Sequence, residues 1–276
     1  MTSEGDVFIS INNKLSGSGQ VPPLKVMPLD GLAVGSDPGG SVGEYEPGYP
    51  IQGKAQLTLK LLPLKEKPAT KGPLEQIQDQ PDLPRVLIIG DSISIGYTIP
   101  VRGILEDFAN VHRPPANCAS SKHGLESIDK WLGNKKWDVI HFNWGLHDLK
   151  YMGPNGENLA DPNLPSNKQQ VPIEQYSKNL DQLVQKMKKT GAKLIWRNTT
   201  PVPEGSKGRV VGDSDKYNKS AAEIMAQHGI PTNDLYSFSK ENWDKIGRKA
   251  NVHFTPQGSK QLATLVAESI AIQLKR

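Results

Sequence analysis

A serine follows directly after a strongly apolar segment of the chain, in the sequence Gly90-Asp91-Ser92. The run VLIIG has the composition of a buried strand, and the residues beyond it are compatible with a helix. A serine between the two lies at the exit of a strand and near a helix N-terminus, where a nucleophile is well placed. The same pattern fits a helix N-cap at Ser92 with Asp91 in the turn, so the segment alone leaves both interpretations open.

A histidine occupies a comparable position near the end of the chain. His253, in RKANVHFTPQG, comes just before a Thr-Pro turn that opens a long amphipathic segment. An imidazole at such a place has the chemistry of a general base that takes a proton from a hydroxyl group. The residue three positions earlier, where a carboxylate would be convenient for holding the ring, is Ala250.

Other polar segments follow or connect the apolar runs. In NWGLHDL, Gly145 permits a tight turn, and we expect His147 and Asp148 to project toward the same rim as the serine. The small residues of NCASSKHG at 117–124 would let backbone N–H groups approach a ligand closely. A fourth rim loop, RNTTPVPEG at 197–205, contains three candidates for a pocket wall: Thr199, Thr200 and Pro201. Ordinary loop residues bonded to the backbone are the alternative interpretation for each segment.

Strands and helices alternate from Arg85 onward. Apolar runs predict strands at VLIIG, WDVIHFNWG and AKLIWRNTTP, and a strand or its end at IPTNDLYSF. Helical spacing predicts helices around VRGILEDFA and in GLESIDKWLG, VPIEQYSKNLDQLVQKMKKTG, KYNKSAAEIMAQHGI and PQGSKQLATLVAESIAIQL. Apolar strands that are each followed by an amphipathic helix favour a parallel sheet covered on both faces. We therefore predict an α/β fold whose functional residues lie beyond the C-terminal strand ends.

The N-terminal part differs in composition from the rest. Residues 1–84 hold 11 of the 22 prolines and none of the five tryptophans. Alternating apolar residues in VFISIN and QLTLKLL predict short strands rather than helices. We predict a β-rich, Pro/Gly-rich extension and linker at residues 1–80, followed by an α/β domain at residues 81–276.

Three segments together resemble a known family. GDSISIG, NWGLHD and NVHFTPQG occur in this order at predicted strand ends and look like blocks I, III and V of the SGNH/GDSL hydrolase superfamily. The resemblance spans roughly Arg85 to the C-terminus. It implies a flavodoxin-like, three-layer α/β/α sandwich with a parallel sheet, and cleavage of carboxylic esters by a serine nucleophile without a metal or organic cofactor. Position by position, it implies that Ser92 is the nucleophile and His253 the general base.

The resemblance also implies an oxyanion hole, and the sequence departs from the family there. The family combines the N–H of the nucleophile, an N–H of a block II glycine and the side chain of a block III asparagine. Here His147 stands in place of that asparagine, and an imidazole N–H can donate to an oxyanion as an amide does. Block II has no clear glycine: Ala119 is the candidate by position, with Ser120 and Ser121 as alternatives. The other residues expected at this place are Gly145 and Asp91.

The family's block V reads Asp-x-x-His, and Ala250 occupies the aspartate position. Three explanations remain open. The chain works as a Ser-His dyad in which a backbone carbonyl or water holds His253; or a carboxylate such as Asp244 or Glu241 substitutes; or the acid was lost, naturally or by engineering. Loss of this acid costs on the order of ten-thousandfold in turnover in serine hydrolases, so impaired activity is one expectation.

Composition excludes several other classes. The net charge is only +4 and the basic residues are scattered, which argues against nucleic acid as a partner. No apolar window is long enough for a membrane span, and MTSEGDVF lacks the features of a secretory signal. We expect a soluble protein, but because export signals are removed on secretion, the compartment stays open. The single Cys118 forms no internal disulfide, and no Cys/His zinc pattern is present. The oligomeric state is not predictable.

The substrate is less well defined than the reaction. Aromatic residues near rim loops (Trp144, Tyr151 and Trp243) and the β-rich extension favour short acyl esters of a carbohydrate or similar polar alcohol, although these aromatics are equally well explained as core. The loop at 150–170, with Lys150 and Tyr151 at its base, is the best candidate for a substrate-shaping lid.

Three other functions are weighed against this one. They are a lipid-directed esterase or lysophospholipase, a non-catalytic binder of acylated ligands, and a metal-dependent hydrolase using His141, His147, Asp148 and His253. The last has no compact ligand motif. Phosphate binding by GDSISIG is weaker still, because the Gly-Lys signature of a P-loop is absent.

Overall fold

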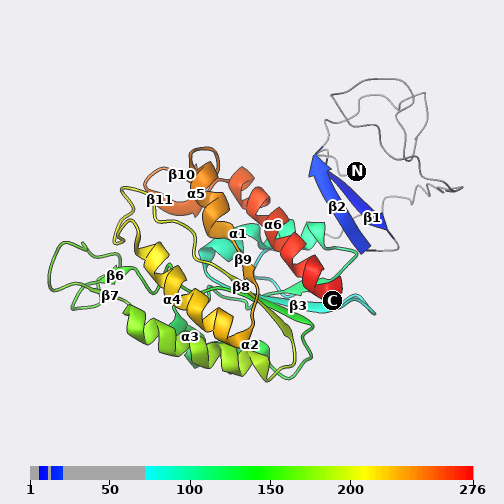
Figure 1. The fold of residues 1–276 in the computed structure, drawn as a ribbon, viewed down its shortest axis with the longest axis horizontal. Helices are drawn as coiled ribbons and strands as arrows, with labels where there is room; N and C mark the ends of the chain where they lie inside the picture. The colour runs from blue at the N-terminus through cyan, green and yellow to red at the C-terminus, as the bar shows by residue number, and fades with distance from the viewer. Residues whose placement is uncertain (1–5, 12–13, 21–71, 276) are drawn as a thin grey trace, which may run out of the picture. The chain divides into compact units, whose positions relative to one another are not determined.

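The computed structural model describes residues 6–11, 14–20 and 72–275. The chain divides into two compact units, Met1–Ala69 and Thr70–Arg276. In the first unit, β1 (Asp6–Ile11) pairs antiparallel with β2 (Lys14–Gln20), so the alternating segment VFISIN does contain a strand (Figure 1). The second predicted strand of that region, QLTLKLL, lies outside the described residues.

The second unit is built on one five-stranded sheet. Its strands lie in the order β4-β3-β5-β8-β9, and every neighbouring pair is parallel. With the strands numbered along the chain, this is the flavodoxin-like order 2-1-3-4-5. The strands are β3 (Arg85–Ile89), β4 (Asn110–His112), β5 (Val139–Phe142), β8 (Lys193–Arg197) and β9 (Thr232–Asn233).

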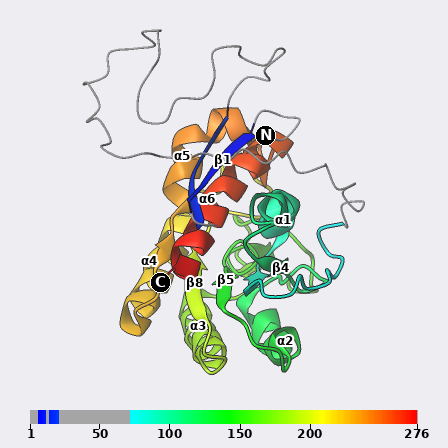
Figure 2. The same ribbon diagram turned by 90° about the vertical axis from the view of Figure 1, so that its right-hand side faces the viewer.

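Five helices of this unit cover the two faces of the sheet, and a sixth, α5, packs against α6. α1 and α6 pack side by side on one face, while α2, α3 and α4 form a row on the other (Figure 2). The predicted three-layer α/β/α sandwich with a parallel sheet is therefore confirmed. The helices are α1 (Ser92–Ile104), α2 (Ser121–Leu132), α3 (Ile173–Lys188), α4 (Asp213–His228), α5 (Leu235–Ile246) and α6 (Pro256–Lys275).

The strands form the centre of the hydrophobic core. Val86, Ile88 and Ile89 of β3 are fully buried, as are Val139 and Ile140 of β5. A strand in a parallel sheet is covered by helices on both faces, which explains why these sequences are continuously apolar instead of alternating. The core thus holds β3 and β5 rigidly side by side, with Ile89 opposite Phe142 at their carboxyl ends.

Two small antiparallel pairs lie outside the main sheet. β6 (Tyr151–Met152) pairs with β7 (Lys168–Gln169), so the long loop expected at 150–170 has a short ladder at its base. β10 (Gly247–Arg248) pairs with β11 (Asn251–Phe254), which forms a hairpin directly before α6.

β4, α5 and the β10–β11 pair were not predicted, and two predicted elements have clearly different boundaries. The first helix begins at Ser92, not near Val101, and continues through Pro100 to Ile104. The predicted strand at IPTNDLYSF is only β9, because Asp234 caps a helix that starts at Leu235: its side chain accepts a hydrogen bond from the Ser237 N–H at 3.0 Å. The helix-capping aspartate therefore determines the structure of this segment, although the aromatic residues that follow it favour a strand.

The strand order fixes where the loops meet. β3 and β5 are neighbours, but the chain leaves them toward opposite faces, since β3 leads into α1 and β5 is followed by α3. The loops after such a pair diverge and leave a crevice at their carboxyl ends. No helix within the described ranges is long and apolar enough to cross a membrane.

Candidate active site

The structure brings together the serine and the histidine that the sequence places 161 residues apart. Ser92 Oγ lies 2.8 Å from His253 Nε2. Ser92 is the first residue of α1, directly after β3, whereas His253 belongs to β11 of the small hairpin. Both side chains are only partly buried. The distance is that of a hydrogen bond along which a proton can pass from hydroxyl to imidazole.

Asp91 positions Ser92 at the start of the helix. Its carboxylate, 1 % exposed, accepts a hydrogen bond from the Ile93 N–H at 3.0 Å and lies 3.4 Å from Arg197 Nη2. The N-cap is therefore Asp91, which excludes the alternative interpretation of Ser92 as the cap. The Ser92 N–H has no partner among residues 72–275, as is usual in the first turn of a helix, and remains available to a ligand.

Asn251 holds the imidazole from the other side. Its Oδ1 lies 2.6 Å from His253 Nδ1 and also accepts a hydrogen bond from the His253 backbone N–H at 3.0 Å. A backbone N–H can only donate, so the atom facing it must be the amide oxygen. Nδ1 must then carry the ring hydrogen, which leaves the Nε2 lone pair for the Ser92 hydroxyl.

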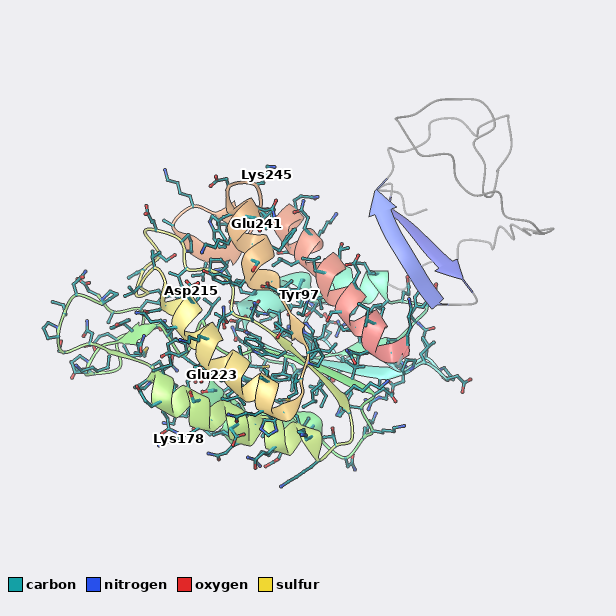
Figure 3. All side chains as sticks on the ribbon, in the orientation of Figure 1. Tyr97, Lys178, Asp215, Glu223, Glu241 and Lys245 are labelled. Carbon is teal, nitrogen blue, oxygen red and sulfur yellow. The ribbon has the colours of Figure 1, made fainter. Side chains whose placement is uncertain are left out.

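The residues considered as replacements for the missing acid are elsewhere. Asp244 and Glu241 lie exposed on α5, and neither forms an ion pair or hydrogen bond with His253 (Figure 3 labels Glu241). Ala250 is in the turn of the β10–β11 hairpin with φ of 49°. Sequence reasoning missed Asn251, although an asparagine two residues before a histidine is a signal for a local side-chain-to-backbone turn.

The electrostatics of the site favour a neutral His253. Burial lowers the pKa of His253; the Asp91 carboxylate opposes this, while Arg209 and Arg248 add to it. A general base must be neutral before it accepts a proton, so a lowered pKa keeps the base ready at neutral pH.

His147 follows β5 and lies within electrostatic range of the same groups. Burial lowers the pKa of His147 to about 4, with smaller effects from Asp91, Lys150, Arg209 and His253. The ring is thus neutral at neutral pH and carries one N–H donor. Neither ring nitrogen has a hydrogen-bond partner within the part of the chain that the structure describes.

Asp148 does not join the rim as expected. It is fully buried and turns toward the start of α2, where its Oδ1 accepts hydrogen bonds from the Ser121 N–H at 2.8 Å and the Ser121 hydroxyl at 2.6 Å. Burial raises the pKa of Asp148 to about 7, against the effect of these two bonds. Asp148 therefore ties the loop after β5 to α2 and leaves His147 alone at the surface of the site.

Ala119 occupies the position expected for a block II glycine. Its φ of 47° is in the left-handed region, which explains a preference for glycine there. Its N–H, however, donates to Asn117 Oδ1 at 3.0 Å, so this donor is already engaged. Of the alternatives, Ser120 caps α2 through its side chain and Ser121 binds Asp148.

The remaining predicted residues are mainly structural. Trp144, Thr199 and Thr200 are fully buried, so Trp144 belongs to the core, the simpler of its two interpretations. Trp243 is partly buried and packs on Phe254, with ring centroids 5.1 Å apart. His141 is fully buried, and burial lowers its pKa to about 4. Among the described residues, no group of three His, Cys, Asp or Glu side chains could hold a metal ion.

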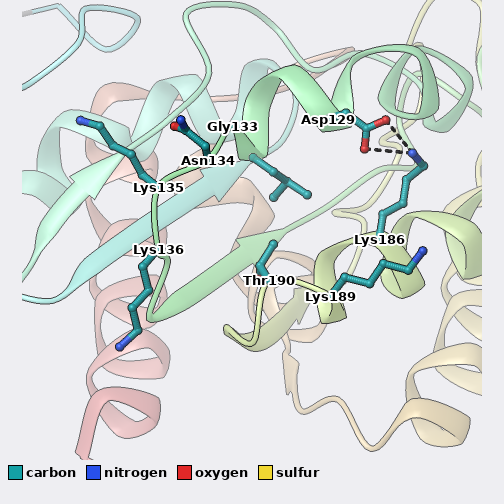
Figure 4. A pocket seen from close by; sticks show the side chains of 9 residues that line it. Asp129, Gly133, Asn134, Lys135, Lys136, Lys186, Lys189 and Thr190 are labelled. Atoms are coloured by element: carbon teal, nitrogen blue, oxygen red, sulfur yellow. Dashed lines mark hydrogen bonds and ion pairs between the residues drawn. The ribbon is translucent and has the colours of Figure 1, made fainter.

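Two cavities differ in what they offer. One, of about 390 Å³, has Ser92 and His253 in its wall, together with the residues Ile93, Gly96, Pro100, Arg248, Phe254, Pro256, Ser259 and Lys260. Another, of about 530 Å³, lies between the C-terminal ends of α2 and α3 and is rich in lysines (Figure 4). Lysines near helix C-termini complement the helix dipole, and this second cavity contains no residue predicted for catalysis. The first cavity is the one of these two that contains the residues predicted for catalysis.

The comparison with protein families agrees with this architecture. A family model described as GDSL-like lipase/acylhydrolase matches residues 86–266. The match extends from β3 into α6 and includes Ser92, His147 and His253. Because it covers more than half of the chain, the protein belongs to the GDSL-like lipase/acylhydrolase family and is a hydrolase. No curated protein matches the sequence significantly.

Solved structures share the fold at low sequence identity. The lipase/acylhydrolase from Enterococcus faecalis matches with a TM-score of 0.56 and 18 % identity, over 68 % of this chain and 96 % of that one. An acetyl xylan esterase, AlAXEase, matches with a TM-score of 0.54 and 16 % identity, over 67 % of this chain and 99 % of that one.

Gly145 is the residue most constrained by packing in the site. A Cβ at this position would lie 2.0 Å from Thr199 Oγ1 and 3.0 Å from Thr199 Cβ, and φ is 154°. We expect Gly145→Ala to lower the free energy of unfolding by about 1–3 kcal/mol, because the buried threonine must move. Chemical denaturation measures this. Gly156→Ala is the control, since φ there is 87° but the space is open; equal losses in both variants would contradict the packing argument.

Proposed function

We propose that this protein hydrolyses carboxylic esters through Ser92, His253 and Asn251, and that it removes acetyl or similarly short acyl groups from a carbohydrate or another polar alcohol. The observation that carries the proposal is the chain of two contacts from Ser92 Oγ through the imidazole to Asn251 Oδ1, at 2.8 and 2.6 Å. Serine and cysteine hydrolases share this arrangement, in which the base lies between the nucleophile and a group that orients the base.

The reaction follows from the proton positions. His253 Nε2 accepts the Ser92 proton while Ser92 Oγ attacks the carbonyl carbon, and the tetrahedral intermediate collapses as His253 returns the proton to the leaving alcohol. Water, deprotonated by the same Nε2, then releases the acid from the acyl-serine. Asn251 keeps Nδ1 protonated throughout and so maintains the productive tautomer. This role removes the reason to expect impaired activity from Ala250.

Two donors suit the oxyanion. The Ser92 N–H is unpaired at the start of α1, where the helix dipole also favours negative charge. His147 supplies the second donor as a neutral imidazole with no other partner. We do not include the Ala119 N–H among the oxyanion donors, because it is already hydrogen-bonded to Asn117.

The preference for a small acyl group and a polar alcohol rests on the cavity and on one similar structure. Four apolar residues in the cavity wall (Ile93, Pro100, Phe254 and Pro256) are accompanied by Arg248, Ser259 and Lys260. A mixed lining of this kind fits a short acyl group with a hydroxylated alcohol better than a long chain. The similarity to AlAXEase, an acetyl xylan esterase, supports the same preference for a short acyl group on a polar alcohol.

The acyl preference is tested with p-nitrophenyl esters from acetate to laurate. We expect kcat/KM to be highest for acetate and to decline beyond butyrate, with Ser92→Ala at least about a thousandfold slower because Ser92 carries the hydroxyl that is hydrogen-bonded to His253. A maximum at laurate would favour a lipid-directed esterase instead. Labelling of Ser92 by a fluorophosphonate, followed by mass spectrometry, distinguishes a catalytic site from a binding site, since only an activated hydroxyl reacts.

The role of Asn251 is tested with two substitutions. Asn251→Ala frees the imidazole and should lower kcat by roughly tenfold to a thousandfold, with little change in KM. Asn251→Asp keeps an acceptor and adds a negative charge, which raises the pKa of His253; the acid limb of the kcat/KM profile should move to higher pH. The parent enzyme should stay active below the ordinary histidine pKa of about 6.5.

Ala250→Asp is the matched comparison for these variants. It restores the family's acid, but His253 Nδ1 already has an acceptor, so we expect kcat to change by no more than about threefold. A gain of several hundredfold in Ala250→Asp, with Asn251→Ala unaffected, would show that Asn251 does not orient the base.

His147 is tested separately as an oxyanion donor. Loss of one such donor costs about a hundredfold to a thousandfold in kcat, and we expect this for His147→Ala. His147→Asn, which supplies an amide donor, should recover a large part of the loss. Because the pKa of His147 is about 4, His147 does not titrate above pH 5. Its removal should therefore shift the acid limb of the kcat/KM profile only slightly in that range. Equal rates in all three proteins would exclude His147 from the hole.

A further inference from the structure

Two basic side chains reach the site without a counterion. Lys150 is only 9 % exposed and follows His147 by three residues. Arg209 comes from the loop after β8, and its Nε–H donates to the Leu146 carbonyl at 3.1 Å, directly beside His147. Lys150 and Arg209 therefore converge on the loop that carries His147, from segments about sixty residues apart in sequence.

Neither cation is paired with a carboxylate. Across residues 72–275, the Lys150 ammonium forms no hydrogen bond or ion pair, and Arg209 uses only Nε, which leaves both of its terminal nitrogens without a partner. Asp148 and Asp91 act on these charges only from beyond contact distance. The unpaired nitrogens of both side chains are not among the fully buried atoms, so they are open to a ligand that supplies the opposite charge.

A backbone contact holds the segments of the two cations together: the N–H of Tyr151, next to Lys150, donates to the carbonyl of Gly208, next to Arg209, at 2.8 Å. In agreement with this, the pKa of Lys150 is lowered by burial and next by repulsion from Arg209. Arg209 also lowers the pKa values of both His147 and His253, after burial. An anion between Lys150 and Arg209 would relieve this repulsion and would lie close to the scissile bond.

We propose that Lys150 and Arg209 bind an anionic group of the substrate, a carboxylate or a similar oxyanion located near the scissile ester. The unused Nη atoms of Arg209 suit the planar, two-point recognition of a carboxylate, and Lys150 adds a point charge. The inference rests on the proposed esterase function and narrows its substrate to acylated acidic alcohols. Hydrogen bonds to charged groups predict a gain of about tenfold to a hundredfold for the anionic substrate.

The test compares 4-acetoxybenzoate with its neutral methyl ester, using the parent enzyme, Arg209→Gln and Lys150→Gln. The two esters differ in leaving-group reactivity, so each protein is described by one ratio, kcat/KM for 4-acetoxybenzoate over kcat/KM for the methyl ester. The informative quantity is the quotient of the parent's ratio and the variant's ratio. We expect this quotient to be at least about ten for both variants. Lys189→Gln removes an exposed charge near the distant cavity of Figure 4 and should give a quotient near one.

Binding without turnover separates this inference from the esterase function. In Ser92→Ala, we expect 4-acetoxybenzoate to bind at least about tenfold more tightly than its methyl ester by titration calorimetry, and Arg209→Gln in that background to abolish the difference. Equal binding of the two esters would overturn the anion site, whatever the hydrolysis rates. Tight anion binding in a protein whose parent hydrolyses neither ester would instead overturn the esterase function and leave the anion site in place.

Discussion

The buried carboxylate of Asp91 is the interaction on which the site depends. It caps α1 through the Ile93 N–H and lies 3.4 Å from Arg197, itself fully buried. Because the cap is residue 91, the next residue is the first of the helix: its N–H is unused and its hydroxyl meets His253. The sheet fixes Arg197 at the end of β8, so the position of Ser92 is set by the core of the sheet rather than by a loop.

A second buried cation, Arg113, connects this cap to the loop before α2. Arg113 is 1 % exposed and donates to the carbonyls of Gly90 and Ala116, each at 3.2 Å, and to the hydroxyls of Ser94 and Thr98. Its donors are satisfied by neutral oxygens, which makes burial tolerable without an ion pair. Arg209 differs from Arg113, because Arg209 is only partly buried and its terminal nitrogens form no hydrogen bond with residues 72–275.

The sequence was sufficient to predict the layout, but not the contacts that support the candidate site. Continuous apolar strands and helical spacing predicted the parallel sheet, and the two residues proposed as nucleophile and base, Ser92 and His253, lie within hydrogen-bond distance of each other. Asn251 was missed because its contact is local and depends on the hairpin, whose two-residue turn no periodicity reveals. Arg209 was missed for the opposite reason: its partner, the Leu146 carbonyl, is 63 residues away, and a backbone acceptor leaves no trace in sequence.

The hairpin also explains why an amide, and not the acid that the resemblance leads one to expect, contacts His253 Nδ1. Ala250 has a left-handed φ of 49° in the turn, and its Cβ is directed toward Gly205, on which an added Cβ would lie only 2.9 Å away. The side chain at the next position folds back and supplies the acceptor for Nδ1 instead. In the proposed reaction a neutral amide would orient the ring without stabilising the imidazolium. Asp91 acts on His253 in the direction that raises its pKa, so in that reaction its carboxylate would favour the cation that the amide cannot stabilise.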